Sequence, residues 1–429
     1  MREDEWRIRD PVWGDIFLTS KDKKILDTFE MQRLRGIKQL DFAFLVYPGA
    51  EHSRFQHSLG VRACVDRIIA MSKIPLDEEE GELVRAAALL HDAATPVFSH
   101  VVSDFFRRFY PNIIPSHEKF VNEVIEGACY RKIQEENPEM VNVAAPLKEV
   151  LEEEGYGRKD RERIMEIITG EGKPSYLSRL VNGPLDADRL DYLKRDAYYT
   201  GVPQSYDDRI FSSFEIDENG ELSLKARPDA VSAAISVLES RFWMMKKVYL
   251  HPTTLSANCL ALELLLRGLG DYDFYHLFTL DDSQFINLLL NNSSLGETKK
   301  LAYRLRYRKL PKKAYMAHIS KLPEKVSRAA LGMVDYHELQ DEIIREVRSE
   351  ASHDELSDID VFIYLPRDYY TEIRGIKAGS YGLGEYDPSI IQTLKTRYNS
   401  LMQVYVYAEK RYVNTVRKVC EKMFETLPQ

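Results

Sequence analysis

Residues 83–100, Leu-Val-Arg-Ala-Ala-Ala-Leu-Leu-His-Asp-Ala-Ala-Thr-Pro-Val-Phe-Ser-His, decide the fold of this chain. Apolar residues recur there at helical spacing, and Pro96 ends the run. The adjacent His91 and Asp92 therefore close an amphipathic helix. Histidine and aspartate are both metal-ligand residue types, so this helix end is a candidate metal site, although such a pair also occurs by chance.

Two residues far from this pair complete a candidate ligand set. His57 lies near the start of an amphipathic helix predicted for residues 57–72, and Asp188 lies in a helix predicted for residues 186–199. Two imidazoles and two carboxylates suit a divalent ion such as Mn, Fe, Co, Ni, Zn or Mg. Such an ion acidifies bound water and polarises a phosphoryl oxygen, which is the chemistry of phosphate-ester hydrolysis.

Composition limits the class of protein. The chain has 429 residues, 44% of them hydrophobic, and a formal net charge of -9, which argues against a protein dedicated to coating nucleic acid. Its four cysteines are widely separated, as expected of reduced core residues and not of a disulfide framework. No apolar stretch reaches the length of a signal sequence or a membrane span. We therefore expect a cytoplasmic protein without a membrane partner.

Helical periodicity dominates the chain and predicts a mostly α fold. Further helices are predicted at residues 21–36, 116–136, 158–170 and 232–266, the last one broken near Pro252. Strand signals are confined to a hairpin around Asn219-Gly220 and to residues 360–365. The pattern divides near residue 270 into a catalytic core, residues 1–270, and an α+β lobe, residues 271–429. The lobe is predicted to carry a basic segment and a long terminal helix that begins at Pro388 and extends as far as Phe424.

A series of motifs resembles a known family. The motifs are Asp10–Gly14, Gln32–Leu40, Tyr47–Gly60, His91-Asp92, Phe98-Ser99-His100, His117-Glu118 and Asp186–Tyr192. In this order they resemble the deoxynucleoside triphosphate triphosphohydrolases of the HD superfamily. The likeness is greatest to the type with a sterile-alpha-motif domain, although no segment here matches that domain, and it covers roughly residues 7–315. The resemblance implies a helical HD-domain core that holds a catalytic metal through His57, His91, Asp92 and Asp188.

The resemblance also implies a substrate site. Residues that match contacts to the triphosphate or the sugar are Arg54, Arg189, Tyr192, Asp196, Arg241 and Tyr249, with Arg189 in place of the usual lysine. Gln39 and Leu40 match a pair that packs against deoxyribose and excludes a 2′-hydroxyl. Two structural alternatives remain open: an ion pair between Arg241 and Asp196, and core packing of Gln39 and Leu40.

The acid–base groups depart from the family pattern. Thr95 replaces a histidine that acts at the phosphate in the family, and threonine cannot supply a proton near neutral pH. His100 and His117 keep their places, and either could protonate the leaving group, with Arg54 beside the phosphate. This departure leaves the scissile phosphoester bond open.

A basic run between Lys299 and Lys313 is unusual in an acidic chain. Its Arg308 and Lys312, together with Asp27, Gln32 and Arg35, match the family's pocket for an activating nucleotide between subunits. A solvated charged face or a site for single-stranded nucleic acid are the alternatives.

The leading functional hypothesis is a metal-dependent dNTP triphosphohydrolase that forms a homodimer or tetramer. The alternatives are an HD-type nuclease or phosphodiesterase acting on DNA ends, a nucleotide phosphatase, and a catalytically inactive nucleotide sensor.

Overall fold

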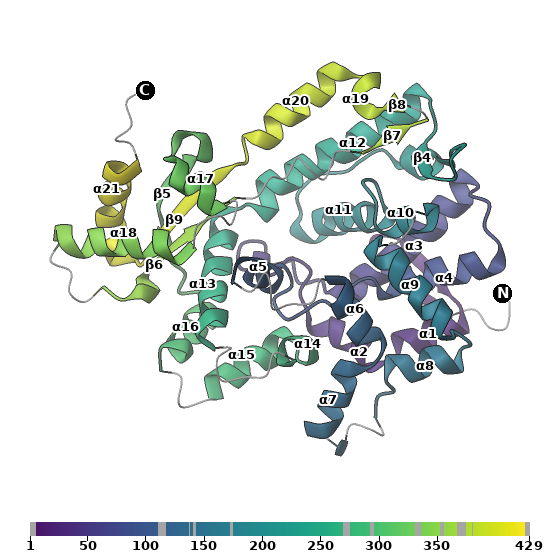
Figure 1. The fold of residues 1–429 in the computed structure, drawn as a ribbon, viewed down its shortest axis with the longest axis horizontal. Helices are drawn as coiled ribbons and strands as arrows, with labels where there is room; N and C mark the ends of the chain where they lie inside the picture. The colour runs from purple at the N-terminus through teal and green to yellow at the C-terminus, as the bar shows by residue number, and fades with distance from the viewer. Residues whose placement is uncertain are drawn as a thin grey trace.

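The computed structural model describes residues 6–109, 117–136, 138–139, 143–171, 175–268, 275–291, 296–330, 336–351, 356–366, 375–379 and 381–424. Helices make up most of these residues, and the small sheets lie mainly in the second half of the chain (Figure 1). The predicted mostly α fold with small β elements is confirmed. Among the described helices, none combines the length and apolarity needed to cross a membrane.

The first half of the chain forms the helical core around the candidate metal ligands. Its elements are β1 (Trp6–Asp10), β2 (Gly14–Leu18), α1 (Ser20–Leu26), α2 (Phe29–Arg33), η1 (Leu34–Gly36), η2 (Ala43–Leu45), α3 (Arg54–Ser72), α4 (Glu78–Leu90), α5 (His100–Phe109), α6 (His117–Ile125), α7 (Ala128–Glu136), α8 (Leu147–Glu153), α9 (Arg158–Thr169), α10 (Tyr176–Val181) and α11 (Ala187–Thr200). Helix α3 packs against both α4 and α11. The three helices that carry the candidate ligands are therefore neighbours.

Each of these three helices begins at a capping residue. The Asp77 carboxylate accepts from the backbone N–H of Glu80 at the start of α4, 2.8 Å away. The Asp186 carboxylate accepts from the backbone N–H of Arg189 in α11 at 2.7 Å. At the start of α3, Gln56 reaches back to the backbone N–H of Ser53. Such caps satisfy backbone donors that a helix leaves unpaired, so the sequence fixes where each ligand-bearing helix starts.

The second half of the chain continues the core and then forms a three-stranded sheet with further helices. Its elements are η4 (Asp208–Ser212), β3 (Phe214–Ile216), β4 (Leu222–Leu224), α12 (Pro228–Met244), η5 (Met245–Tyr249), α13 (Pro252–Gly268), α14 (His276–Thr279), α15 (Asp282–Asn291), α16 (Gly296–Arg306), β5 (Lys312–His318), η7 (Ile319–Lys321), α17 (Glu324–Ala330), α18 (Tyr336–Ala351), η8 (Asp358–Asp360), β6 (Val361–Tyr364), β7 (Lys377–Ala378), β8 (Tyr381–Gly382), α19 (Leu383–Tyr386), α20 (Pro388–Asn399), β9 (Gln403–Ala408), η10 (Lys410–Tyr412) and α21 (Val413–Phe424). The predicted hairpin around Asn219-Gly220 is confirmed as β3 and β4.

The predicted long terminal helix is wrong. Helix α20 ends at Asn399, strand β9 follows, and α21 is a separate helix. Strand β9 is the centre of a three-stranded antiparallel sheet of order β5-β9-β6. This sheet packs with α17, α18 and α21 around a second hydrophobic core that includes Val404 and Val406. The division near residue 270 stays a prediction, because residues 269–274 lie outside the described residues.

Three further differences concern helix continuity and the N-terminus. The helix predicted for residues 21–36 is interrupted between α1 and α2, where Asp27 caps α1 and Thr28 begins the next turn. The helix predicted for residues 116–136 is divided at Gly127, whose φ of +75° is unfavourable for other residues. Strands β1 and β2 form a hairpin that the sequence reading did not predict.

Candidate active site

His57, His91, Asp92 and Asp188 meet at the junction of α3, α4 and α11. His57 Nε2 lies 2.8 Å from Asp188 Oδ1 and 3.3 Å from His91 Nε2. Asp92 Oδ2 lies 3.9 Å from His57 Nε2 and 3.6 Å from His91 Nε2. Within the described part of the chain, the ligand atoms of His57, His91 and Asp92 lie within 4.8 Å of one another, which is close enough for all three to bind one metal ion. The structure therefore brings together all four predicted ligands.

The orientation of the two imidazoles fits a metal ion. The Nδ1 atom of His57 donates to Asp191 at 2.7 Å, and Nδ1 of His91 donates to the carbonyl of Ala88 at 2.9 Å. With its proton kept on Nδ1, each ring can offer its Nε2 lone pair to an ion, and the two Nε2 atoms lie 3.3 Å apart. Two opposed lone pairs beside two carboxylates repel one another unless a cation lies among them. This donor set suits a divalent ion.

The charges of this cluster perturb its titration. Without an ion, a proton on Nε2 takes its place: burial opposes a charged His57, but hydrogen bonds to Asp188 and Asp191 raise the pKa of His57 to about 10. Burial also disfavours the Asp92 carboxylate, yet Arg54 and the two imidazoles hold its pKa well below its usual range. The pocket therefore favours positive charge beside its carboxylates.

Asp191 connects His57 to the N-terminal hairpin. Its carboxylate also accepts from Arg195 Nε at 2.8 Å and from the indole N–H of Trp13. Arg195 is fully buried and donates on to Asp10 at 2.8 Å. A carboxylate on the far nitrogen of a ligand histidine fixes the ring and raises its basicity. Sequence analysis assigned no role to Asp191 or Asp10, although both lie in the motifs that it quoted.

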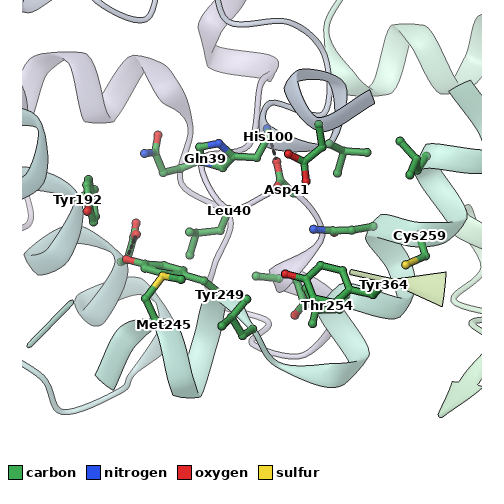
Figure 2. A pocket seen from close by; sticks show the side chains of 18 of the residues that line it. Gln39, Leu40, Asp41, His100, Tyr192, Met245, Tyr249, Thr254, Cys259 and Tyr364 are labelled. Atoms are coloured by element: carbon green, nitrogen blue, oxygen red, sulfur yellow. Dashed lines mark hydrogen bonds between the residues drawn. The ribbon is translucent and has the colours of Figure 1, made fainter. Parts of the chain in front are cut away.

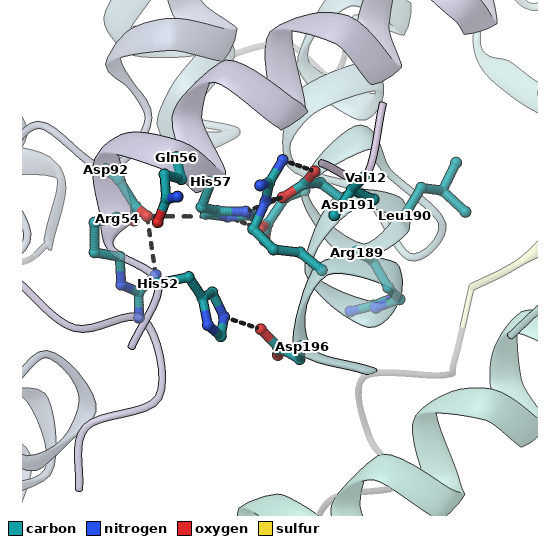
Figure 3. Close-up of polar contacts among 12 residues, drawn as sticks. Val12, His52, Arg54, Gln56, His57, Asp92, Arg189, Leu190, Asp191 and Asp196 are labelled. Carbon is teal, nitrogen blue, oxygen red and sulfur yellow. Dashed lines mark hydrogen bonds and ion pairs between the residues drawn. The ribbon is translucent and has the colours of Figure 1, made fainter. Parts of the chain in front are cut away.

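Arg54 and Thr95 hold Asp92 from two sides. Arg54 donates to Asp92 Oδ2 at 2.9 Å (Figure 3) and also to the Ser99 hydroxyl. The Thr95 hydroxyl donates to Asp92 Oδ1 at 3.0 Å. The second guanidinium nitrogen of Arg54 lies 3.1 Å from Nε2 of His100. Since a guanidinium only donates, Nε2 of His100 accepts, and neutral His100 carries its proton on Nδ1.

A cavity of about 350 Å³ lies beside the metal cluster. Its walls include Asp188, His100 and all eight predicted substrate residues, which are Gln39, Leu40, Arg54, Arg189, Tyr192, Asp196, Arg241 and Tyr249. The volume falls in the range of small-molecule sites. Figure 2 shows the cavity with Tyr192 near one end and Leu40 near its centre. The structure therefore gathers the motifs of five separated segments around one space.

Both carboxylate oxygens of Asp196 have hydrogen-bond partners. Its two oxygens are bonded by His52 Nε2 at 2.8 Å and by the Tyr249 hydroxyl at 2.7 Å. Arg241 lies over the ring of Tyr398, 5.5 Å from its centroid, and its ion pair with Asp196 stays an alternative. Asp196 is thus fixed as an acceptor at the cavity wall.

A π-helical turn sets the relative direction of Arg241 and Tyr249. Eight residues of regular α-helix would leave their side chains about 80° apart around the helix axis. Element η5 replaces the last turn with wider π-helical hydrogen bonding, which rotates less per residue. Both side chains consequently line the same cavity.

Asp41 is a cavity residue that sequence analysis missed. Its backbone has a φ of +48°, an unusual conformation for a residue with a side chain. Its carboxyl accepts from the backbone N–H of His100 at 3.1 Å, and burial raises its pKa to about 8. The one sequence feature that could have indicated Asp41 as a cavity residue is its position directly after Gln39-Leu40.

The predicted regulatory residues lie at two places. Gln32 donates to the carbonyl of Leu26 at 2.7 Å and accepts from Arg35 at 2.8 Å. Asp27 lies one turn before them and pairs with Lys23. Arg308 donates to the carbonyl of Leu45 at 2.9 Å, and Lys312 begins β5. The regulatory pocket stays a prediction.

His117 begins α6, but its side chain lies outside the described residues. Its predicted catalytic role therefore stays a prediction.

Comparison with known families identifies the family of this chain. A model described as the HD domain matches residues 54–192, and one described as the HD-associated region matches residues 208–428. The chain belongs to the HD-domain phosphohydrolase family. The first match contains all four metal-ligand candidates of this HD-domain protein.

Relatives of this HD-domain protein include characterised and uncharacterised proteins. It is 33% identical over 301 residues to the uncharacterized protein YwfO of Bacillus subtilis, covering 68% of this chain and 63% of the relative. It is 29% identical over 270 residues to the human deoxynucleoside triphosphate triphosphohydrolase SAMHD1, covering 57% of this chain and 41% of the relative. The chain thus spans less than two thirds of either relative.

A solved structure matches almost the entire HD-domain protein. The crystal structure of a hypothetical protein from Aquifex aeolicus aligns with a TM-score of 0.71 at 25% identity. The alignment covers 97% of this chain and 99% of the other. The similarity therefore includes the C-terminal lobe as well as the HD domain.

Proposed function

We propose that this protein hydrolyses deoxynucleoside triphosphates to deoxynucleosides and triphosphate. The observation that carries the proposal is the single cavity that joins the metal cluster to three arginines and the Gln39-Leu40 pair. The likeness to a deoxynucleoside triphosphate triphosphohydrolase supports it.

His57, His91, Asp92 and Asp188 would hold a divalent metal, which supplies an acidified water and polarises a phosphoryl oxygen when bound. Arg54, Arg189 and Arg241 line the cavity and neutralise the polyphosphate. Water adds to the α-phosphorus while the bond to the 5′-oxygen breaks. His100, which lines the cavity, is the acid: as an imidazolium it gives a proton to that oxygen, and the proton released by the attacking water restores it.

The sugar is selected at Gln39 and Leu40. Gln39 is buried, and its side-chain oxygen has no hydrogen-bond partner among the described residues. It accepts from a sugar hydroxyl, because a buried acceptor without a partner gains from a donor. Leu40 is also buried and leaves no polar partner for a 2′-hydroxyl at the adjacent wall.

The test is a substrate panel with a matched inactive variant. Manganese-loaded protein is incubated with each dNTP and each NTP, with and without added GTP, and products are identified by mass spectrometry. We expect inorganic triphosphate from dNTPs and none from the Asp188→Asn variant. Release of no triphosphate under all these conditions would contradict the proposal.

A second candidate is a phosphodiesterase on single-stranded nucleic acid. The exposed rings of Tyr303 and Tyr307 are stacked, with centroids 6.1 Å apart, and Lys299, Lys300 and Lys309 line the surface depression beside them. Exposed aromatics among lysines suit bases and backbone phosphates. Salt-sensitive binding to single-stranded DNA that the Tyr303→Ala/Tyr307→Ala variant loses would favour this candidate.

Assembly into a dimer or tetramer stays a prediction. Light scattering with and without nucleotide tests it, and a monomer under both conditions would contradict it.

A further inference from the structure

The cavity continues past the residues assigned to phosphate and sugar. At its other end it is lined by Thr254, Asn258 and Cys259 of α13 and by Ile363 and Tyr364 of β6. Figure 2 shows Thr254, Cys259 and Tyr364 together, with Leu40 between them and Tyr192. The Ser256 hydroxyl bonds the carbonyl of Pro311 at 2.7 Å and so fixes α13 against the C-terminal lobe. This end of the cavity is therefore a defined space between two rigid elements.

Two polar atoms at this end have no partner among the described residues. They are Thr254 Oγ1 and Asn258 Oδ1, both buried. Residues four apart on a helix share a face, so both atoms belong to the wall that α13 presents to the cavity. A helical threonine usually bonds a carbonyl of the preceding turn, and a buried amide oxygen usually accepts a hydrogen bond. Their lack of partners indicates that a ligand donates to them.

The remaining lining describes the shape of that ligand. Leu255, Leu262 and Ile363 are buried apolar residues, and Tyr364 adds an aromatic ring. An apolar slot with an aromatic wall and a few polar atoms suits a flat heterocycle. Since the sugar is assigned to Leu40, the group attached to it beyond Leu40 is the base.

We propose that this end of the cavity is a nucleobase subsite that prefers bases carrying an exocyclic amino group. This inference rests on the proposed function. Adenine and cytosine present an amino donor beside a ring acceptor, and guanine also carries an amino group, whereas the one donor of the thymine ring, N3–H, lies between two carbonyl oxygens. A carbonyl opposite the oxygen of Asn258 leaves two buried acceptors facing each other, which disfavours thymine.

The test compares the four dNTPs on the wild-type protein and on two variants. We expect kcat/KM for dATP, dCTP and dGTP to exceed that for dTTP by about tenfold. Asn258→Leu removes the amide at similar volume, and we expect it to bring the ratio close to one while dTTP turnover is retained. Thr254→Val is an almost isosteric change, and we expect it to lower the ratio of kcat/KM for the other three dNTPs over dTTP as well.

The control is Thr253→Val, whose side chain precedes the cavity residue on the same helix and is not among the lining residues. It is expected to leave the base preference unchanged. Equal kcat/KM for all four dNTPs in the wild-type protein would overturn the base subsite and leave the proposed function intact. An equal fall for every dNTP in both variants would also overturn it, because that is the effect of a structural role.

A binding measurement tests the base subsite even if the protein does not hydrolyse dNTPs. If no dNTP is hydrolysed, calorimetry with the four deoxynucleosides is the deciding measurement. Weaker binding of thymidine than of the other three, lost in Asn258→Leu, would support the subsite although the proposed function failed. Equal or absent binding of all four would overturn it.

Discussion

The Thr95 hydroxyl donates a hydrogen bond to Oδ1 of Asp92, 3.0 Å away, so the residue that replaces the expected histidine orients a candidate metal ligand. This bond directs the other oxygen, Oδ2, toward His57 and His91. We expect Thr95→Val to lower the affinity for manganese by about tenfold or more, since partners of metal ligands contribute on that scale. Calorimetric metal titration measures it. Thr95→Ser keeps the hydroxyl and serves as the control, and a Thr95→Val protein with wild-type affinity would show that the bond does not orient Asp92.

Asp191 is expected to be a stability residue as well as a support for His57. Its carboxylate faces the fully buried Arg195, so Asp191→Asn leaves that buried cation with Asp10 as its one remaining charge partner among the described residues. We expect the free energy of unfolding of the metal-free protein to fall by about 3–5 kcal/mol. Urea denaturation measures the change. Glu162→Gln, which removes the exposed pair with Arg158, is expected to cost less than about 1 kcal/mol. Similar losses in the two variants would be inconsistent with this role.

Leu40 is expected to control the choice of sugar. Leu40→Ala opens the cavity wall beside the sugar, so a 2′-hydroxyl meets less steric resistance. We expect the ratio of kcat/KM for ATP over dATP to rise by about tenfold. Leu45→Ala, a partly buried leucine outside the cavity lining, is the control. An unchanged ratio in Leu40→Ala would assign Leu40 to core packing alone.

The buried Glu30 predicts a pH dependence of the stability of the protein. One of its oxygens accepts from the backbone N–H of Leu147 at 3.0 Å, the other has no partner among the described residues, and burial raises its pKa to about 7. Between its ordinary pKa of 4.5 and 7, the folded protein keeps a proton that the unfolded chain has lost, so stability falls as pH rises. We expect Glu30→Gln to match wild type near pH 4 and to be more stable by about 2–3 kcal/mol at pH 8.

Urea denaturation across this pH range measures the Glu30 effect. Glu162→Gln again provides the surface control. A Glu30→Gln protein whose advantage does not grow with pH would contradict the assignment of the raised pKa to Glu30.

The site was more predictable from sequence than the elements that support it. The metal-ligand candidates and the predicted cavity residues lie in short motifs. Once those motifs were recognised, the sequence predicted that these side chains would lie close together. Asp191 and Asp10 were missed because an aspartate beside arginines usually marks a solvated helix face. Their burial depends on a hairpin from the other end of the domain, which local sequence does not specify.

Strand β9 was missed for a related reason. As the central strand of its sheet it is buried on both faces along Val404–Ala408, so it lacks the alternation that marks a half-buried strand. Its apolar residues therefore continued the helical stripe of α20. The hairpin of β1 and β2 was missed because β1 is mostly exposed and carries charged residues.

Trp13 donates a hydrogen bond to Asp191, and Arg195 donates one to Asp10, so the first hairpin helps to hold the Asp191–Arg195 pair that positions His57. A tag, proteolytic cut or deletion in this hairpin would keep all four metal-ligand candidates in the chain, but it would remove the support that orients the His57 imidazole toward the ion. Preparations shortened at that end are therefore expected to lose metal before they lose helicity.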